Sequence, residues 1–217
     1  MTEELPAQLF ARVDETPDAD FYTEPRLVAH IDPETIAALT DFYEEFVPPG
    51  ADVLDLMSSW ISHLPTHITY GRVAGLGMNI EELAANPRLS EYCVHDLNNQ
   101  PDLPFEPDSF DAALITVSIQ YLIRPVEVLR SVANVLRPGG RICIAVSHRM
   151  FPTKAILAFR QLEAAEKIRL VATYLQSSGY EKVDFIDRSP PVGDPLWLLV
   201  ADVTDVAEKY PRVDFST

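Results

Sequence analysis

Short apolar runs, each followed by a segment with helical periodicity, recur along the chain and constrain its fold more than any other feature. The runs are bounded by Gly, Pro, Asn or Asp and are too short for buried helices, so they are typical of strands buried in a parallel sheet. A proline-rich turn joins the last two runs, which indicates an antiparallel pair. The expected strands are 52–56, 71–79, 92–96, 109–117, 141–147, 182–186 and 196–202.

This alternation predicts an α/β fold with a mostly parallel sheet and helices on both faces. Capping residues and helix breakers place the helices between the strands. The expected helices are 33–46, 80–85, 126–136 and 154–178, the last with a break near 161–166. Residues 1–32 are rich in Asp, Glu and Pro and predict an N-terminal extension with a loosely held tip, ahead of one domain at 33–217.

Composition excludes several classes of partner. The chain has 17 Lys and Arg against 33 Asp and Glu, a net charge of −16, so its field repels nucleic acids and anionic membrane surfaces. Cys93 and Cys143 both fall in expected strands, which favours buried free thiols in a reducing compartment. The start of the chain has no signal-peptide pattern and no apolar stretch is long enough to span a membrane, so we expect a cytoplasmic protein.

The first expected strand opens into an unusual loop. In α/β sheets, ligands bind beyond the carboxyl ends of the strands, and the loop after the first strand commonly approaches the ligand closely. Here that strand ends at Asp55-Leu56 and is followed by Met57-Ser58-Ser59-Trp60, with no glycine. Side chains therefore occupy positions where bare backbone is usual.

Four motifs together resemble one family. They are Val53-Leu54-Asp55-Leu56, Asp96-Leu97 followed by Leu103-Pro104-Phe105, Ser109-Phe110-Asp111-Ala112-Ala113-Leu114, and Val135-Leu136-Arg137-Pro138-Gly139-Gly140. Over about residues 33–202 the chain resembles the class I S-adenosylmethionine-dependent methyltransferases of the type 11 kind. The resemblance implies a Rossmann-like, doubly wound sheet of seven strands with a terminal antiparallel hairpin. It also implies S-adenosylmethionine as cofactor and methyl transfer to N, O or S of a small molecule.

The resemblance also implies where the cofactor lies, across the carboxyl ends of the first four strands. Asp96 matches the carboxylate that bonds the adenine amine, Leu97 would pack on the adenine face, and the loop containing Ser118 and Gln120 would contact the methionine part. The cofactor-binding residues expected on this basis are Asp55, Met57, Ser58, Ser59, Trp60, Gly77, Met78, Asn79, Asp96, Leu97, Ser118 and Gln120.

Two departures from the family pattern leave alternatives open. The first loop lacks glycine, and Gly77 stands where the family has an acidic residue that holds the ribose hydroxyls. Loss of one such charged hydrogen bond costs about 1.5–3 kcal/mol. The cofactor binds if Ser58, Ser59 and Asn79 replace the lost contacts. Otherwise the fold serves as a non-catalytic binding or regulatory module, or the pocket takes another nucleotide or metabolite.

Acceptor and base residues are expected around the same crevice. His63 and His148 are candidate general bases, because imidazole titrates near neutrality. Tyr22, Arg26 and His30 lie in the extension, which forms a lid in related methyltransferases, and they could fix a carboxylate-bearing substrate. Tyr121 and Arg149 are further substrate candidates after two strands, and each of these residues also has a plain structural interpretation. No metal site is expected, because Pro65 prevents the helix that would align His63 with His67. The oligomeric state stays open.

Overall fold

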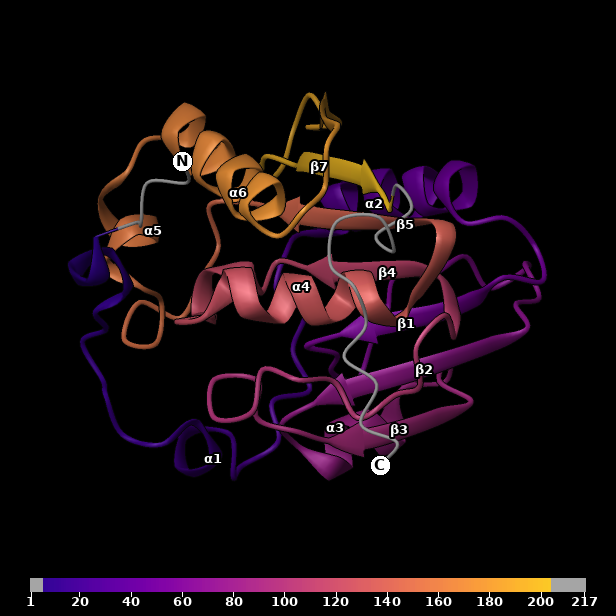
Figure 1. Ribbon diagram of the computed structural model, residues 1–217, viewed down its shortest axis with the longest axis horizontal. Helices are drawn as coiled ribbons and strands as arrows, with labels where there is room; N and C mark the ends of the chain where they lie inside the picture. The colour runs from indigo at the N-terminus through magenta and orange to yellow at the C-terminus, as the bar shows by residue number, and fades with distance from the viewer. Residues whose placement is uncertain (1–5, 204–217) are drawn as a thin grey trace, which may run out of the picture.

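The computed structural model describes residues 6–203 of the 217-residue chain. Its centre is a seven-stranded sheet in the order β3-β2-β1-β4-β5-β7-β6 (Figure 1). The strands are β1 Asp52–Leu56, β2 Arg72–Gly77, β3 Glu91–Val94, β4 Phe110–Thr116, β5 Leu136–Val146, β6 Val183–Asp187 and β7 Trp197–Asp202. The first five are parallel, and β7 is antiparallel to both β5 and β6. The predicted α/β sheet and its terminal antiparallel pair are therefore confirmed.

Helices cover both faces of the sheet, as expected. They are α1 Asp18–Phe21, α2 Pro33–Phe46, α3 Ile80–Ala85, α4 Pro125–Val135, α5 Leu157–Gln161 and α6 Ala164–Ser177, with 3-10 turns η1 Ala7–Phe10 and η2 Ile119–Tyr121. Asp32 caps α2 by accepting the backbone N–H of Thr35 at 2.9 Å. The expected break in the last long helix separates α5 from α6, where Glu163 and Glu166 form a capping box.

One predicted boundary is wrong. Arg137-Pro138-Gly139-Gly140 were expected to form the turn that ends a helix, with the strand beginning at Arg141. Instead β5 begins at Leu136, which pairs with Phe110 of β4 across a register shift, and Gly139 has a φ of +79°. The strand therefore includes both glycines, and the register shift accommodates them. The earlier start gives Leu136 a strand partner and a place in the core.

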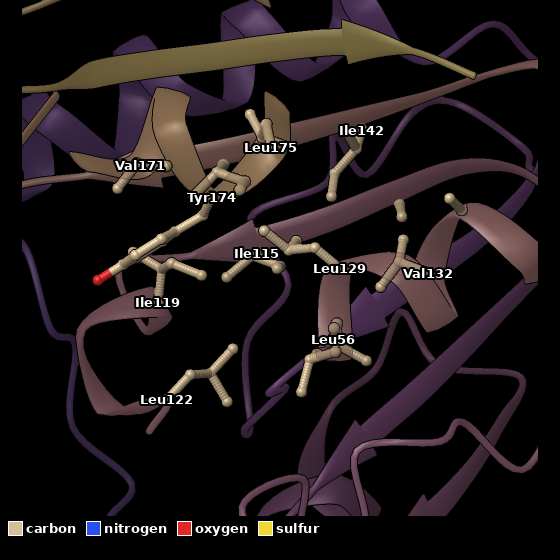
Figure 2. Packing of buried hydrophobic residues seen from close by; sticks show 14 of the residues in the cluster. Leu56, Ile115, Ile119, Leu122, Leu129, Val132, Ile142, Val171, Tyr174 and Leu175 are labelled. Carbon is tan, nitrogen blue, oxygen red and sulfur yellow. The ribbon is translucent and has the colours of Figure 1, made fainter. Parts of the chain in front are cut away.

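The alternation of strand side chains divides the core into two layers. On one face, Leu56, Ile115 and Ile142 pack against side chains of α4 and α6 (Figure 2). The helix residues in that layer include Leu129, Val132, Val171, Tyr174 and Leu175. On the other face, Val53, Leu114 and Val200 pack against α2 through Leu39, Tyr43 and Phe46. The two layers hold the carboxyl ends of the parallel strands in fixed positions.

Residues 6–31 form a segment that we call the strap, and ion pairs fasten it to the loop after β5. Lys154 is completely buried there, with its Nζ 2.6 Å from the carbonyl oxygen of Thr16, 3.3 Å from Asp18 and 3.4 Å from Asp14. Backbone hydrogen bonds join Asp14 to Thr153 and Leu157 to Ala11. The strap is therefore an integral layer of the domain. The tip expected to be loosely held lies partly outside the described residues.

The two cysteines differ in burial. Cys143 in β5 is buried and Cys93 in the edge strand β3 is half-buried, and both are free thiols. The expectation that both are buried is thus wrong for Cys93, since an edge strand lacks a neighbour on one side. Within residues 6–203, no helix combines the length and apolarity that crossing a bilayer requires.

Candidate functional site

A cavity of about 300 Å³ lies at the carboxyl ends of β1 to β5, beneath the strap. It includes the point between β1 and β4 where the strand order reverses, which is where open α/β sheets bind ligands. Its volume is at the lower end of the range for small-molecule sites. Position and size therefore make it the candidate active site.

Most of the residues predicted for the site line this cavity. Among the expected cofactor-binding residues these are Asp55, Met57, Ser58, Ser59, Gly77, Met78, Asn79, Asp96, Leu97 and Ser118. Among the others they are His63, Tyr22, His30, Tyr121 and Arg149. The fold thus brings together residues from five strand ends and from the strap.

Two of the expected cofactor residues lie outside the cavity lining. The indole N–H of Trp60 donates to the carbonyl oxygen of Val28 at 3.0 Å, so this side chain is held against the strap. Gln120 is buried, and its amide donates to the carbonyl oxygens of Val117 at 2.8 Å and Arg149 at 3.2 Å. It joins the loops after β4 and β5, which is a structural role.

Arg26 and His148 are also outside the lining. The guanidinium of Arg26 lies 4.2 Å from the ring centroid of Phe21 and 5.6 Å from that of Phe151, so aromatic rings hold it. The Nε2 of His148 contacts Asp194 at 2.9 Å. Of the two candidate bases, only His63 is placed against the cavity.

The loop after β1 is held by a buried carboxylate. Oδ2 of Asp55 accepts hydrogen bonds from the hydroxyls of Ser58 and Ser62, each at 2.6 Å. Burial raises the pKa of Asp55 to about 6, against the two hydroxyl hydrogen bonds, which lower it. A carboxylate without a cationic partner thus stands beside the cavity.

Gly77 is required by this loop. A Cβ at position 77 would lie 2.2 Å from the carbonyl oxygen of Ser58, whose N–H donates to Leu76 at 2.8 Å. Another backbone segment therefore approaches β2 closely at Gly77. At Gly75, by contrast, a Cβ would meet the side chain of Leu89 at 2.3 Å. An acidic side chain at position 77 is excluded by the loop itself.

Unusual backbone conformations gather around the cavity. Met57, His63 and Val117 have φ values of 57°, 56° and 47°, and all three line it. Left-handed backbone is uncommon for residues with a Cβ, and it is a genuine outlier for a β-branched valine. Such conformations cost about 1–3 kcal/mol each and cluster at functional sites. Met57 also adopts here the conformation that a glycine would take without strain.

His63 carries an unsatisfied polar atom. Its ring is buried, and no hydrogen-bond partner for Nδ1 is present among the described residues. Burial, and then the charge of His30, lower the pKa of His63 to about 4. The imidazole is therefore neutral at neutral pH. The hydroxyl of Ser118, also in the lining, is a second buried polar group without a partner in residues 6–203.

Asp96 presents a carboxylate oxygen to the cavity region. Its Oδ1 accepts the backbone N–H groups of Asn98 at 3.0 Å and Asn99 at 3.3 Å, which fixes the side chain. Within residues 6–203, Oδ2 has no hydrogen-bond partner. Leu97 beside it is buried and also lines the cavity.

Glu82 is a site residue that the sequence did not reveal. This buried carboxylate of α3 lines the cavity, and it accepts the hydroxyl of Ser59 at 2.5 Å and the N–H of Arg26 at 2.7 Å. Asn79 caps the same helix and donates to the carbonyl oxygens of Tyr22 and Thr23. Acids in the first turn of a helix are explained by capping alone, so the pattern gave no sign of a ligand site.

Aromatic rings line the part of the cavity near β5. The ring of Tyr121 stacks on Phe151 with centroids 6.0 Å apart, and its hydroxyl accepts the N–H of Phe151 at 2.8 Å. His30 contacts Phe151 edge-on at 5.6 Å. Burial raises the pKa of Tyr121, which keeps its hydroxyl protonated. Within the described chain, no cluster of three His, Cys, Asp or Glu side chains is arranged to hold a metal ion.

Comparison with known families agrees with the fold. A model of the methyltransferase domain matches residues 68–144. A demethylmenaquinone methyltransferase of Lactococcus lactis is 32% identical over 113 residues, covering 48% of this chain and 45% of that protein. An O-methyltransferase of Penicillium expansum is 36% identical over 92 residues, covering 40% of this chain and 33% of that protein. The chain spans less than half of the length of these curated relatives.

Solved structures share the fold at low sequence identity. An S-adenosylmethionine-dependent methyltransferase from Mesorhizobium loti aligns with a TM-score of 0.54 and 17% identity, covering 78% of this chain and 99% of that one. The [4+2]-cyclase SpnF aligns with a TM-score of 0.58 and 16% identity, covering 76% and 80%. Residues 68–144 thus match the methyltransferase domain, and the sheet order is that of the S-adenosylmethionine-dependent methyltransferase structure from Mesorhizobium loti, so the chain is similar to class I S-adenosylmethionine-dependent methyltransferases in this segment and in its fold.

Proposed function

We propose that the protein transfers the methyl group of S-adenosylmethionine to an N, O or S atom of a small molecule. The observation that carries the proposal is the cavity at the switch point of the sheet, into which Asp55, Glu82 and Asp96 bring carboxylates. S-adenosylmethionine carries a sulfonium and an ammonium group, so an acid-rich cavity suits its charge. The names of the relatives, which include an O-methyltransferase, support the same reaction class.

The residues present fit this cofactor despite the missing glycines. Met57 takes the left-handed conformation, Ser58 turns its hydroxyl toward Asp55, and Trp60 lies against the strap. Two of the three side chains are thus already held by partners, Ser58 by Asp55 and Trp60 by the carbonyl oxygen of Val28. The absence of glycine in the loop after β1 is therefore compatible with cofactor binding.

Three residues would hold the nucleoside. The free oxygen of Asp96 would accept the adenine amine, and Leu97 would pack on the ring. Glu82 would receive the ribose hydroxyls in place of an acid at Gly77, since each of its oxygens already accepts one hydrogen bond and has a second lone pair available. Ser118, whose hydroxyl lacks a partner in residues 6–203, would contact the methionine part.

When bound, the cofactor supplies an electrophilic methyl group for in-line displacement. The contribution of the chain is to orient the acceptor and to exclude water under the strap. His63 stays neutral and would accept a hydrogen bond from the acceptor's O–H or N–H, which stabilises the developing positive charge on the nucleophile. Because its pKa is low, it suits an acidic proton better than an amine.

Calorimetric titration with S-adenosylmethionine and S-adenosylhomocysteine tests the proposal. We expect both to bind, and Asp96→Ala to weaken S-adenosylhomocysteine about tenfold or more, as loss of a charge-assisted hydrogen bond implies. The matched control is Asp102→Ala, an exposed aspartate outside the cavity. Absence of binding at millimolar ligand would contradict the proposal.

A second candidate function is a cofactor-free binding module. It is favoured by the internal hydrogen bonds already made by Ser59, Asn79 and Glu82, which join the loop, α3 and the strap without any ligand. The [4+2]-cyclase with the same fold illustrates that this architecture is not tied to one reaction. The same titration separates the two, because the module would bind neither cofactor form.

A further inference from the structure

Arg149 is distinctive among the cavity residues because of its charge. Within residues 6–203, the lining contains four carboxylates, from Asp18, Asp55, Glu82 and Asp96, and Arg149 provides its sole Lys or Arg side chain. That side chain is 56% exposed, so it is accessible to solvent and to a ligand. A lone cation at one end of an acidic cavity is a candidate determinant of which ligand can bind.

A buried aspartate holds this arginine in place. Asp194, whose side chain is 6% exposed, accepts Nε of Arg149 at 2.8 and 2.9 Å. Its Oδ1 also contacts His148 Nε2, and its Oδ2 accepts the N–H of Asp32. The carboxylate of Asp32 in turn accepts the N–H groups of Thr35 and Asp194. Both nearby carboxylates are thus satisfied within the protein.

This anchoring leaves the far edge of the guanidinium available. Nε alone bonds Asp194, and among the described residues no partner takes the two terminal nitrogens of Arg149. Two parallel N–H groups on a planar, fixed guanidinium match the two oxygens of a carboxylate. The anchor also reduces the entropy lost when a ligand binds, because the side chain is already oriented.

The neighbouring surface is aromatic. Arg149 is followed by Met150 and Phe151, which both line the cavity, and Phe151 stacks with Tyr121 and meets His30 edge-on. Such a wall suits a flat, apolar body. Arg149 and Phe151 come from one short loop after β5, while Tyr121 follows β4 and His30 belongs to the strap, and all four line the same cavity, so a single ligand can contact the cation and a ring.

We propose that Arg149, held by Asp194, forms a carboxylate-binding subsite that selects an aromatic acid as the methyl acceptor. The role of the aromatic acid as methyl acceptor rests on the proposed function. The binding of the aromatic acid itself is independent of the cofactor. In this arrangement Asp194 is a positioning residue, because it acts only through Arg149.

Binding of paired probes tests the subsite. The probes are 4-hydroxybenzoate and cinnamate, each compared with its amide, which has the same shape without the charge. Affinities are measured by calorimetry with and without S-adenosylhomocysteine. For the unaltered protein we expect at least one acid to bind about tenfold or more tightly than its amide, the size expected for a charge-assisted hydrogen bond.

Substitutions at Arg149 then assign the effect. Arg149→Gln should remove the preference for the acid and leave amide binding unchanged, and Arg149→Lys should restore part of it because the charge returns without the planar fork. Arg124→Gln is the matched control, since Arg124 is similarly exposed and pairs with Glu127 away from the cavity. Asp194→Asn should weaken binding of the acid and leave binding of its amide unchanged. Near-ultraviolet circular dichroism verifies that each variant is folded.

The outcomes separate the subsite from the proposed function. Failure of S-adenosylhomocysteine to bind overturns the proposed function, while an acid preference that depends on Arg149 still supports the subsite. Equal affinity of both acids and their amides for the unaltered protein overturns the subsite. The subsite is also overturned if Arg149→Gln lowers the affinity for S-adenosylhomocysteine by the same factor as the affinity for the acid. The arginine would then bind the carboxylate of the cofactor.

Discussion

The two ends of β1 carry the same residue type in opposite environments. At the amino end, Asp52 is partly exposed and bonds Arg137 at 2.8 Å, and the same arginine bonds Asp111 at 2.8 Å. At the carboxyl end, Asp55 is buried, has hydroxyl partners only, and its pKa is raised to about 6. Only two residues therefore separate a paired surface carboxylate from a buried one without a cationic partner.

Under the proposed function, the amino end of the sheet serves folding and the carboxyl end serves a ligand. At the amino end, hydrogen bonds from the N–H of Asp52 and from Arg137 outweigh the effect of burial and lower the pKa of Asp111, so its charge is stabilised in the native state. At the carboxyl end, the buried charge of Asp55 and the left-handed backbone at Met57 and His63 are costs. Such costs are tolerated where a ligand can offset them.

The largest effect is expected at Gly77, the tightest point of the carboxyl end. Gly77→Ala places a Cβ 2.2 Å from the backbone oxygen of Ser58, so the loop must move, and we expect a loss of about 3 kcal/mol in the free energy of unfolding together with loss of S-adenosylhomocysteine binding. Gly75→Ala is the control in the same strand. It meets a flexible leucine side chain and should cost about 1 kcal/mol. Equal losses in the free energy of unfolding of Gly77→Ala and Gly75→Ala, measured in urea, would contradict a special role of the loop.

A pH-dependent effect of comparable size is expected at Asp55. Its folded-state pKa is raised, so the protonated form stabilises the fold below about pH 4, and this contribution is lost as the pH rises through about 6. At pH 7 the buried charge costs about 3 kcal/mol. Asp55→Asn should therefore gain stability at pH 7 while it weakens cofactor binding, as measured by urea unfolding and calorimetry.

His63 provides the matched measurement, because burial lowers its pKa and its contribution to stability therefore changes with pH in the opposite direction. Its folded-state pKa is lowered to about 4, so its contribution is present above pH 6.5 and is lost as the pH falls through about 4. The two slopes oppose each other between about pH 4 and 6 in the unaltered protein. In Asp55→Asn only His63 remains, so stability should fall as the pH is lowered. In His63→Gln only Asp55 remains, so stability should fall as the pH rises toward neutral. Identical pH profiles in all three proteins would mean that neither group is buried as described.

The smallest effect is expected at the amino end. Asp52→Asn removes one partner of a partly exposed ion pair, which is worth about 1 kcal/mol or less and is weakened by salt. Cofactor affinity should not change. A loss of binding comparable to that of Asp55→Asn would show that the two ends of the strand are not separate in function.

The sequence predicted the sheet well because its signals are local. Each strand was located within a few residues, apart from the start of β5, and the expected helix 33–46 has the bounds of α2. The expected residues that reached the cavity, such as Asp55 and Asp96, lie at or just beyond strand ends, whose position follows from the topology. Periodicity and capping are therefore enough to predict where a parallel sheet presents its loops.

The remaining errors come from contacts between distant segments. Trp60 and Arg26 were expected at the ligand, but a carbonyl of the strap holds one and aromatic rings from two segments hold the other. Glu82 was overlooked because its partners, Ser59 and the N–H of Arg26, are 23 and 56 residues away in the chain. No local pattern encodes these directions, since they depend on how the strap crosses the sheet.

The buried ammonium group of Lys154 makes two remote parts of the chain inseparable. Its hydrogen bond to the carbonyl oxygen of Thr16 spans 138 residues, and Asp14 and Asp18 supply the compensating charge. A buried charge that loses its partners costs about 3–5 kcal/mol, a large share of the stability of a typical domain. A chimera that exchanges the strap with a relative must therefore exchange the loop after β5 as well, and a shortened chain that begins after residue 18 would retain the lysine without its counter-ions.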